Sequence, residues 1–247
     1  MGKNIWITGA SSGIGKALAE KFANEGWQVA ISARRKELLD EIARNVNITS
    51  FPLDVTDNNK VKEVFLSILN KYKDIDLCVF CSGAYDPKLE KEINNEQIRK
   101  IMDVNFFGVL NCIKAVEDYF KSKKEGHISI VSSIAAYRGL PNSSGYGPSK
   151  AALTNLTERL YFDFKKYNVR ISLVSPGFIK TALTDKNTFN MPFIKSPEYA
   201  ANKMYNGLIN SNAFEITFPK ALTTFLKLLR VLPYRMYLFL VEKGVKR

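Results

Sequence analysis

The chain of 247 residues is 46% hydrophobic and carries a formal net charge of +12. This length is ordinary for a single α/β domain, and the apolar fraction is enough for a sizeable core. Three cysteines without a recognisable secretion signal argue against a secreted, disulfide-rich protein and favour the cytoplasm. With His127 as the single histidine and Cys78 and Cys81 as the only close cysteine pair, we expect no metal site.

The amino-terminal end combines a strand, a glycine-rich turn and a helix. An apolar run over residues 3–8 is predicted to be a strand, and Thr8-Gly9-Ala10-Ser11-Ser12-Gly13-Ile14-Gly15 follows at once. Gly9 allows a tight turn, and Gly13 and Gly15 allow the backbone to approach a ligand closely. Because helix N-termini bind phosphate, this order of elements predicts a site for the pyrophosphate of a dinucleotide.

The second predicted strand, over residues 27–33, is followed by Arg34 and Arg35. An acidic residue here would bind the ribose 2′-hydroxyl of NAD, whereas arginine suits the 2′-phosphate of NADP. The alternative is that both arginines merely begin the next helix. Beside the glycine-rich turn we favour the phosphate interpretation, so NADP is the expected cofactor and NAD the less favoured one.

Strands and helices alternate along the rest of the chain. Strands are expected over residues 48–53, 76–80, 127–132, 169–175 and 213–218, and helices over 96–123, 145–166 and 197–208. This alternation predicts a single Rossmann-type α/β domain over residues 1–218, with a doubly wound parallel sheet of about seven strands and helices on both faces. The loop between the strand expected over residues 169–175 and the helix expected over 197–208 spans residues 178–197. It is long enough to predict a lid over the substrate.

The segment Tyr146-Gly147-Pro148-Ser149-Lys150 is the strongest candidate for chemistry. Positions four apart share one helical face, so the phenol of Tyr146 and the ammonium of Lys150 can lie side by side. A neighbouring positive charge favours the phenolate and lowers the pKa of a tyrosine. Such a tyrosine can give or accept a proton near neutral pH.

Taken together, these motifs resemble the short-chain dehydrogenase/reductase family of the classical type. The turn over residues 8–15 has the spacing TGxxxGxG, Ser133 lies thirteen residues before Tyr146, and Asn105 opens an NxxG segment. The resemblance covers residues 3–218. It implies an oxidoreductase that interconverts an alcohol and a carbonyl by hydride transfer, often as a homodimer or homotetramer assembled through the two long helices.

The resemblance implies catalytic roles for Asn105, Ser133, Tyr146 and Lys150. Tyr146 would be the general acid in reduction and the base in oxidation, and Lys150 would lower its pKa and bind the nicotinamide ribose. Ser133 would hydrogen-bond the substrate oxygen, and Asn105 would hold a water in a proton relay. Hydride transfer to a carbonyl leaves an alkoxide, which needs such donors.

The resemblance also implies a cofactor-binding set. Asp54 and Val55 would meet the adenine, Gly83 the adenosine ribose, and Ile179 and Thr181 the carboxamide. The whole expected set is Gly9, Ser11, Ser12, Gly13, Ile14, Gly15, Arg34, Arg35, Asp54, Val55, Ser82, Gly83, Tyr146, Lys150, Pro176, Gly177, Ile179 and Thr181. One segment departs from the family pattern, because Phe80-Cys81-Ser82-Gly83 stands where the family usually has Asn-Asn-Ala-Gly. Gly83 is kept, but Cys81 replaces the second asparagine, which in the family ties neighbouring strands, and we expect a changed strand contact.

The substrate pocket is expected to be lined by the variable segments. Besides Ser133 and Tyr146, the candidates are Tyr85, Leu140, Met191 and Phe193. Aromatic and aliphatic residues dominate these segments, which favours a small apolar alcohol or carbonyl compound. The identity of the substrate does not follow from the sequence.

The tail over residues 219–247 is predicted to be a basic amphipathic helical segment. From residue 220 onward it holds seven basic residues against Glu242, which is half of the net charge. We expect Lys220, Thr223 and Lys227 on one face and Leu222, Phe225 and Leu226 on the other. Such a helix fits peripheral contact with the inner face of a membrane through residues 220–242, but packing on its own domain or on a partner subunit is an equal alternative.

Two functions of other classes compete with the enzyme. One is an inactive cofactor-binding scaffold or sensor, and the presence of Ser133, Tyr146, Lys150 and Asn105 argues against it. The other is a membrane-surface interaction protein whose core is only a platform. Nucleic-acid binding is not expected, because no recognition motif accompanies the basic charge.

Overall fold

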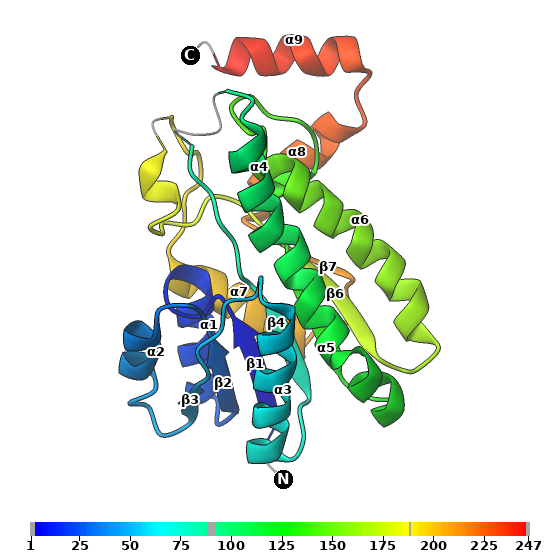
Figure 1. The fold of residues 1–247 in the computed structure, drawn as a ribbon. Coiled ribbons are helices and arrows are strands. Elements are labelled where there is room, and N and C mark those ends of the chain that lie inside the picture. Colours follow the sequence, from blue (N-terminus) through cyan, green and yellow to red (C-terminus); the bar gives the residue numbers. More distant parts are fainter. Residues whose placement is uncertain (1–2, 88–91, 188, 246–247) are drawn as a thin grey trace.

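The computed structural model describes residues 3–87, 92–187 and 189–245. Within them, seven parallel strands form one sheet in the order β3-β2-β1-β4-β5-β6-β7. The strands are β1 (Asn4–Thr8), β2 (Gln28–Ser32), β3 (Ile48–Ser50), β4 (Leu77–Phe80), β5 (His127–Val131), β6 (Arg170–Pro176) and β7 (Glu215–Phe218). Figure 1 shows helices on both faces of this sheet, which confirms the predicted doubly wound fold.

The helices lie in two layers. Those of the main domain are α1 (Gly13–Asn24), α2 (Lys36–Ile42), α3 (Asn58–Tyr72), α4 (Asn95–Met102), α5 (Gly108–Lys123), α6 (Tyr146–Lys165) and α7 (Pro197–Ile209). Apolar residues of α1, α2 and α7 share one core cluster, and those of α3, α5 and α6 share another. The tail adds α8 (Lys220–Arg230) and α9 (Tyr234–Val245).

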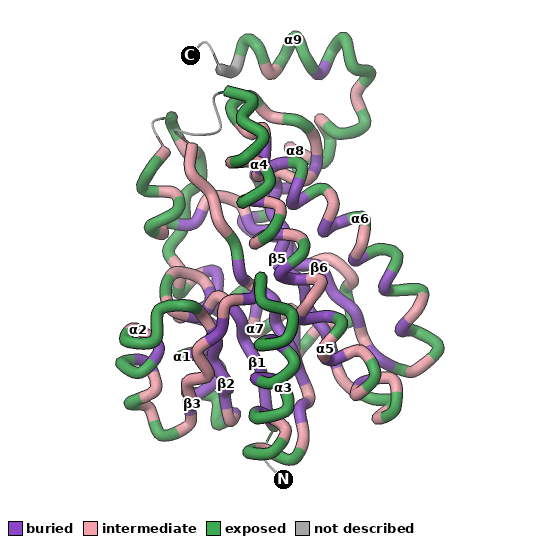
Figure 2. Tube along the Cα trace, viewed as in Figure 1, coloured by how far each residue is buried: buried purple, intermediate pink, exposed green. Residues whose placement is uncertain are grey.

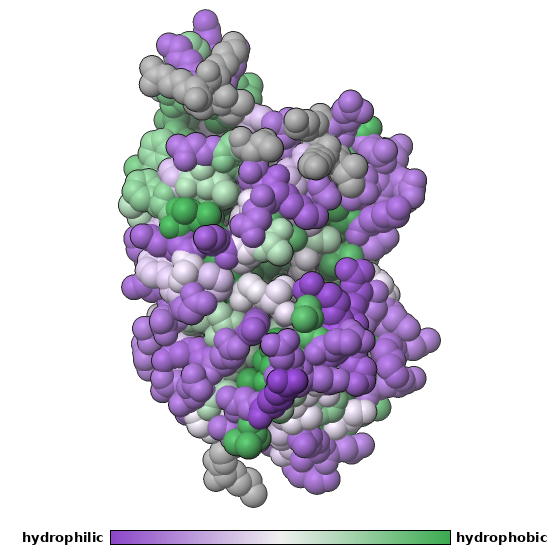
Figure 3. Space-filling model, turned by 90° about the vertical axis from the view of Figure 1, so that its left-hand side faces the viewer, coloured by the Kyte–Doolittle hydropathy of each residue, from purple (hydrophilic) through white to green (hydrophobic). Residues whose placement is uncertain are grey.

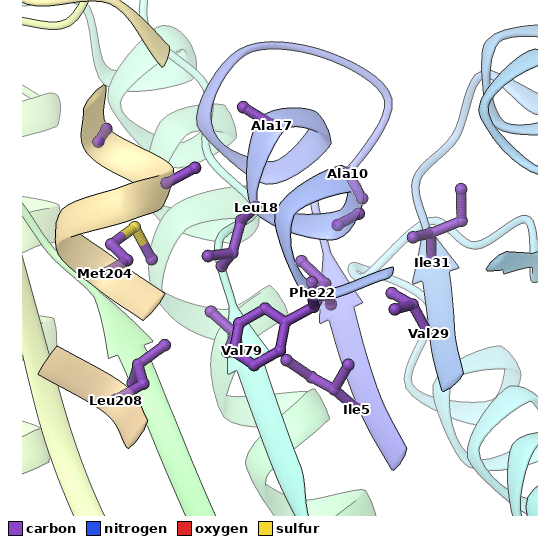
Figure 4. Packing of buried hydrophobic residues seen from close by; sticks show 14 of the residues in the cluster. Ile5, Ala10, Ala17, Leu18, Phe22, Val29, Ile31, Val79, Met204 and Leu208 are labelled. Carbon is purple, nitrogen blue, oxygen red and sulfur yellow. The ribbon is translucent and has the colours of Figure 1, made fainter. Parts of the chain in front are cut away.

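The two cores follow from the alternation of side chains along each strand. In β1, Ile5 and Ile7 enter the cluster beneath α1 and α7, whereas Trp6 enters the cluster beneath α3 and α5. Figure 4 shows the first cluster, where Phe22 of α1 and Met204 of α7 converge on the sheet. The burial map of Figure 2 accordingly places the strands inside the molecule, with both faces covered.

Two predicted elements differ in detail from the structure. The third strand is shorter than residues 48–53, although Phe51 and Leu53 still donate backbone hydrogen bonds to β2 and the residue after it. The predicted helix over residues 96–123 contains a π-helical turn, Asp103–Phe107, between α4 and α5. A β-carbon on Gly108 would lie 2.5 Å from the Val55 side chain, so this wider turn stands where the helix packs tightly against the segment after β3.

The tail packs differently from the expected division of its faces. Thr223, expected on the polar face, is 1% exposed, and Phe225, expected on the packed face, is 57% exposed. Leu222 and Thr223 attach α8 to the domain beside Gly177 and Pro219. The docked stripe is therefore rotated, and several large apolar residues of the tail face outward.

From β1, the chain adds β2 and β3 on one side of the sheet and then β4 to β7 on the other, so the strand order switches between β1 and β4. Thr8 pairs with Phe80 at the carboxyl ends of these two strands. The residues that follow, the glycine-rich turn and the segment Cys81-Ser82-Gly83, are therefore neighbours. Ligands of open α/β sheets bind at such a reversal.

His127 provides a pH-dependent test of the core. Its Nε2 lies 2.7 Å from the Ser172 hydroxyl, and burial, with a smaller contribution from Arg170, lowers the pKa of the imidazole to about 3. The unfolded chain binds a proton near pH ~6.5, so stability is full above that pH and falls as the pH decreases. Relative to His127→Asn, wild type should lose about 2 kcal/mol of unfolding free energy between pH 7 and pH 5.

Urea unfolding at several pH values measures this difference. Ile128→Val, a neighbouring buried change without a titrating group, should reduce stability equally at each pH. A pH-independent difference in unfolding free energy between His127→Asn and wild type would contradict the lowered pKa of the His127 imidazole.

Candidate active site

The glycine-rich turn forms a cradle of exposed backbone at the strand ends. A β-carbon on Gly9 would lie 2.7 Å from the Cys81 carbonyl oxygen, and one on Gly15 would lie 2.4 Å from the Gly9 carbonyl oxygen. Gly9 also has a φ of +70° and Gly13 a φ of +55°, which favour glycine. The turn leads into the N-terminus of α1, so its N–H groups fit a pyrophosphate.

Arg35 crosses over this turn. Its Nη2 donates hydrogen bonds of 3.0 Å to the hydroxyls of both Ser11 and Ser12. Arg34 and Arg35 are both exposed at the end of β2. One guanidinium thus lies over Ser11 and Ser12 of the cradle. The sequence predicts Arg35 to bind the 2′-phosphate of NADP.

The residues expected to meet the adenine lie after β3, and Ser82 and Gly83 lie after β4. Val55 is buried against α5, and its carbonyl accepts from Asn111 Nδ2 at 3.0 Å. The Asp54 carboxylate accepts hydrogen bonds from the Thr56 backbone N–H and hydroxyl. Ser82 is buried and Gly83 is exposed, so backbone is accessible after β4.

Cys81 contacts the end of β1 through its backbone. Its N–H donates to the Thr8 hydroxyl at 3.3 Å. Burial raises the pKa of its thiol to about 11, so the side chain is neutral at physiological pH. The changed contact between strands that the asparagine-to-cysteine replacement implies stays a prediction.

Tyr146 begins α6, and Lys150 lies one turn later on the same face. The Lys150 Nζ is 5.8 Å from the centre of the Tyr146 ring and donates a 2.9 Å hydrogen bond to the Val131 carbonyl at the end of β5. Lys150 is 3% exposed. Burial lowers the pKa of its ammonium group to about 8.

Asn105 links this lysine to the segment after β4. It is fully buried in the π-helical turn, and its amide accepts from the Ala84 N–H at 2.6 Å and donates to the Ala84 carbonyl at 3.0 Å. It also donates to the Ser149 hydroxyl at 3.0 Å. A β-carbon on Gly83 would lie 3.7 Å from both Asn105 Oδ1 and Lys150 Nζ, so these three predicted residues meet.

Ser133 caps a short 3₁₀ helix, Ile134–Ala136, directly after β5. Its hydroxyl accepts from the Ala135 N–H at 3.1 Å. This short helix packs on the start of α6, where a β-carbon on Gly147 would lie 3.6 Å from the Ala135 carbonyl. The preceding Ser132 donates to the Lys150 carbonyl at 2.9 Å and thereby ties β5 to α6.

The lid is more ordered than an unstructured loop. Ile179 pairs with Lys195, and a 3₁₀ turn spans Thr184–Lys186. Gly13 would meet the Thr181 side chain at 2.9 Å if it carried a β-carbon, so the lid begins beside the cradle. Pro176 ends β6, but Gly177 packs mainly against Pro219 and Leu222 at the start of α8.

The expected substrate-lining residues have different environments. The Tyr85 ring lies 4.9 Å from that of Tyr146, and the Tyr85 hydroxyl donates to the lid residue Asn187 at 3.0 Å. Met191 contacts the same asparagine. Leu140 is half-buried, whereas Phe193 is 57% exposed on the outside of the lid.

Comparison with known proteins decides the family. A family model described as short chain dehydrogenase matches residues 3–192. The chain belongs to the short-chain dehydrogenase/reductase family. An uncharacterised oxidoreductase of Myxococcus xanthus is 34% identical over 94% of this chain and 93% of its own length. The 3-oxoacyl-(acyl-carrier-protein) reductase FabG of Thermotoga maritima is 34% identical over 75% of this chain and 77% of its own.

Solved structures agree with the family fold. A short-chain dehydrogenase from Streptomyces avermitilis superposes with a TM-score of 0.84 over 100% of this chain and 98% of its own, at 22% identity. ElxO with NADP bound has a TM-score of 0.77 at 27% identity, over 88% of this chain and 98% of its own. A Burkholderia phymatum family member in complex with NAD has a TM-score of 0.79 at 21% identity, over 92% of each chain.

Some residues that organise the site escaped the sequence analysis. Ser149 binds Asn105, and Thr184 accepts from the Thr181 N–H at 2.9 Å while its hydroxyl contacts the Ile179 carbonyl at 2.6 Å. The Ser143 hydroxyl accepts from the Gly147 N–H in the first turn of α6. Only Ser143 carried a signal, as a serine just before a predicted helix.

The buried charge of Lys150 predicts a pH-dependent cost to stability. Because its folded pKa of about 8 lies below the ordinary 10.5, the unfolded chain binds more protons between these values and stability rises with pH. Lys150→Met removes the charge at similar length. The advantage of this variant over wild type in unfolding free energy should shrink by about 3 kcal/mol between pH 7 and pH 10.5.

Urea unfolding of both proteins across this range measures the change. The exposed Lys62 offers a matched control, since Lys62→Met should differ from wild type by a nearly constant amount. A constant difference for Lys150→Met would show that Lys150 does not titrate near pH 8.

Proposed function

We propose that the protein is an NADP(H)-dependent oxidoreductase that interconverts an alcohol and a carbonyl on an apolar substrate. The observation that carries the proposal is the meeting of Gly83, Asn105 and Lys150 beside the start of α6, where Tyr146 lies. The glycine cradle and Thr181 border the same edge of the sheet. Family membership supports the oxidoreductase class.

The residues divide the proposed work between binding and proton transfer. A bound nicotinamide cofactor supplies or accepts the hydride. Tyr146 donates its phenolic proton to the substrate oxygen in reduction and recovers a proton from the alcohol in oxidation. Ser133 donates a second hydrogen bond to that oxygen and stabilises the charge that develops there.

Lys150 and Asn105 support Tyr146 from behind. The ammonium of Lys150 favours the ionised phenol electrostatically and would bind the nicotinamide ribose. Asn105 is held by Ala84 and Ser149 and would position a water in the path of the proton. The rigid amide sets this geometry before substrate arrives.

The choice of NADP rests on Arg34 and Arg35. A guanidinium binds phosphate through parallel hydrogen bonds, and Arg35 already lies on the two serines of the cradle. ElxO, with which the chain shares 27% identity, has been solved with NADP and, as a tyrosine-to-phenylalanine variant, with NADPH. Asp54 accepts from Thr56 and does not follow β2 directly, where an NAD-selective acid would stand.

The substrate class follows from the lining. Tyr85 packs on Tyr146, and Met191 and Leu140 are half-buried nearby in the chain segments that border the site. These side chains favour an apolar alcohol or ketone.

We also propose a homodimer or homotetramer and an intracellular location. Peripheral contact of residues 220–242 with a membrane is not required for the reaction.

Cofactor selectivity gives the first test. Arg35→Ala should weaken NADPH binding about tenfold or more, and leave NADH binding nearly unchanged, because only NADPH carries the 2′-phosphate. Fluorescence titration of the reduced cofactors measures both affinities. Arg34→Ala separates the two arginines, and Arg44→Ala, an exposed arginine beyond α2, should leave both affinities unchanged. Equal loss for the two cofactors would contradict NADP selectivity.

Removal of the phenol tests catalysis separately from binding. Tyr146→Phe should lower kcat by about 10²–10⁴-fold, because it deletes the proton donor but retains the ring. NADPH affinity should change little, and Tyr161→Phe, on the same helix, should keep full activity. An NADPH-coupled screen of apolar ketones and aldehydes supplies the substrate. Tight NADPH binding without turnover of any substrate would favour the scaffold alternative.

A further inference from the structure

One end of the molecule concentrates the exposed apolar side chains. Most of the large apolar residues that are exposed among the described parts of the chain lie in the lid, α8 and α9, or just before α4. They include Leu183, Phe189 and Ile194 of the lid and Phe225, Leu228, Val231, Tyr234, Met236, Leu238, Phe239 and Leu240 of the tail. Figure 1 places the lid, α8 and α9 at the same end of the molecule.

We call the surface formed by these residues of the lid, α8 and α9 the lid–tail end. Figure 3 shows hydrophobic side chains gathered near the upper end of the molecule, the end that carries α9 in Figure 1. Within residues 234–243, Tyr237 is the only buried side chain. The exposed apolar residues of α9 therefore face away from the domain; they are Tyr234, Met236, Leu238, Phe239 and Leu240.

Several contacts nevertheless fix the tail to the loop after Ser133. Arg138, in the loop after Ser133, donates to the carbonyls of Leu229, Arg230 and Leu232 at 3.0, 3.2 and 2.7 Å. Its guanidinium lies 4.5 Å from the ring of Tyr234 and 4.2 Å from that of Tyr237. The Tyr237 hydroxyl donates to the Gly139 carbonyl at 2.6 Å. These contacts give the outward face of α9 a defined orientation relative to the loop after Ser133.

The charge of the lid–tail end has one predominant sign. Lys220, Arg230, Arg235 and Lys243 are exposed on the tail, and Glu242 is the one acidic residue of α8 and α9 within residues 220–243. Lys180 and Lys195 are exposed on the lid. Basic side chains next to exposed aromatic and aliphatic ones are typical of helices that lie at the surface of an anionic bilayer.

The dimensions fit a surface helix and not a spanning one. No helix among residues 3–87, 92–187 and 189–245 is long and apolar enough to cross a bilayer. α8 and α9 have 11 and 12 residues, against roughly 20 for a span. Figure 1 shows α9 lying across the end of the molecule, an orientation in which its whole length can rest on a flat surface.

A second copy of the chain is a poorer occupant of this surface. In a two-fold symmetric dimer the same basic patch meets itself, so Arg230, Arg235 and Lys243 of one copy would face basic residues of the other. Like charges brought together oppose association. An anionic lipid surface meets both the apolar and the basic residues with complementary chemistry.

We propose that the lid–tail end docks on an anionic lipid bilayer, with α9 in the interface and the lid facing the lipid. The aromatic and aliphatic side chains enter the boundary between headgroups and acyl chains, and the basic side chains contact lipid phosphates. The lid would then meet compounds dissolved in the bilayer. This proposal concerns binding and does not depend on catalysis or on the cofactor.

Vesicle flotation of the full-length protein tests the docking. Vesicles of phosphatidylcholine with phosphatidylglycerol should bind wild type, vesicles of phosphatidylcholine alone should bind it far more weakly, and added salt should reduce the difference. Arg235→Gln/Lys243→Gln should weaken binding to the anionic vesicles about 25-fold, since each basic charge contributes about fivefold. Leu238→Ser/Phe239→Ser should weaken it about tenfold or more.

Matched variants on α3 control for surface changes in general. Leu66→Ser and Lys62→Gln/Lys71→Gln alter exposed residues of the same types and should leave vesicle binding unchanged. Thermal unfolding verifies that each variant is folded. The proposal is overturned if wild type binds neither kind of vesicle, or if the tail variants bind as tightly as wild type. Loss of an oligomer in the tail variants, without any vesicle binding by wild type, would identify a second copy as the occupant.

A fluorescent reporter tests the position of the lid. Phe189→Trp places an indole on the exposed lid, and its emission should shift to shorter wavelength when anionic vesicles are added. Val46→Trp places one before β3, at the opposite edge of the sheet, and should show no shift. Vesicle binding without a shift at position 189 would show that the tail docks while the lid stays in water, which would overturn that part of the proposal.

Discussion

The close approach of β1 and β4 at their carboxyl ends is the constraint on which the site depends. Thr8 pairs with Phe80, and the backbone of Gly9 then lies so near that of Cys81 that any side chain on Gly9 would overlap it. This contact directs the chain into α1 with its N–H groups exposed. It also leaves Gly83 accessible above Asn105 and Lys150. A parallel register thus brings the glycine-rich turn and the residues proposed for proton transfer, far apart in the chain, to one edge of the sheet.

Most of the fold could be predicted because it is specified locally. Apolar runs, glycine positions and helical periodicity gave the order of strands and helices, and the strand-helix alternation gave the parallel sheet. The spacing of Tyr146 and Lys150 gave their shared helical face. The hydrogen bond between Asn105 and Ser149 could not be predicted, since it joins residues 44 positions apart through a π-helical turn. Likewise, the sequence offered Arg35 as a phosphate ligand but contained no sign of its contact with Ser11.

The packing of the tail was the part that sequence reasoning could least determine. An amphipathic pattern shows that a helix has an apolar side, but the stripe that docks depends on the surface beneath it. Gly177 and Pro219 form that surface for Leu222, and Thr223 lies in the same buried stripe, with its hydroxyl donating to the Pro219 carbonyl at the start of α8. Phe225 is turned outward as a consequence. The mixed stripe is therefore a result of tertiary context overriding the helical pattern.

Arg138 shows how this packing reaches the site. The last carbonyls of a helix have no partners within it, and a cation near them is favoured by the helix dipole. Arg138 satisfies such carbonyls at the end of α8 while its guanidinium stacks on two aromatic rings of α9. Because the same residue lies two positions before Leu140, the conformation of this border of the pocket and the placement of the tail are determined together. A force or ligand that moves α9 must therefore also act on the loop after Ser133, to which Arg138 and Tyr237 attach the tail.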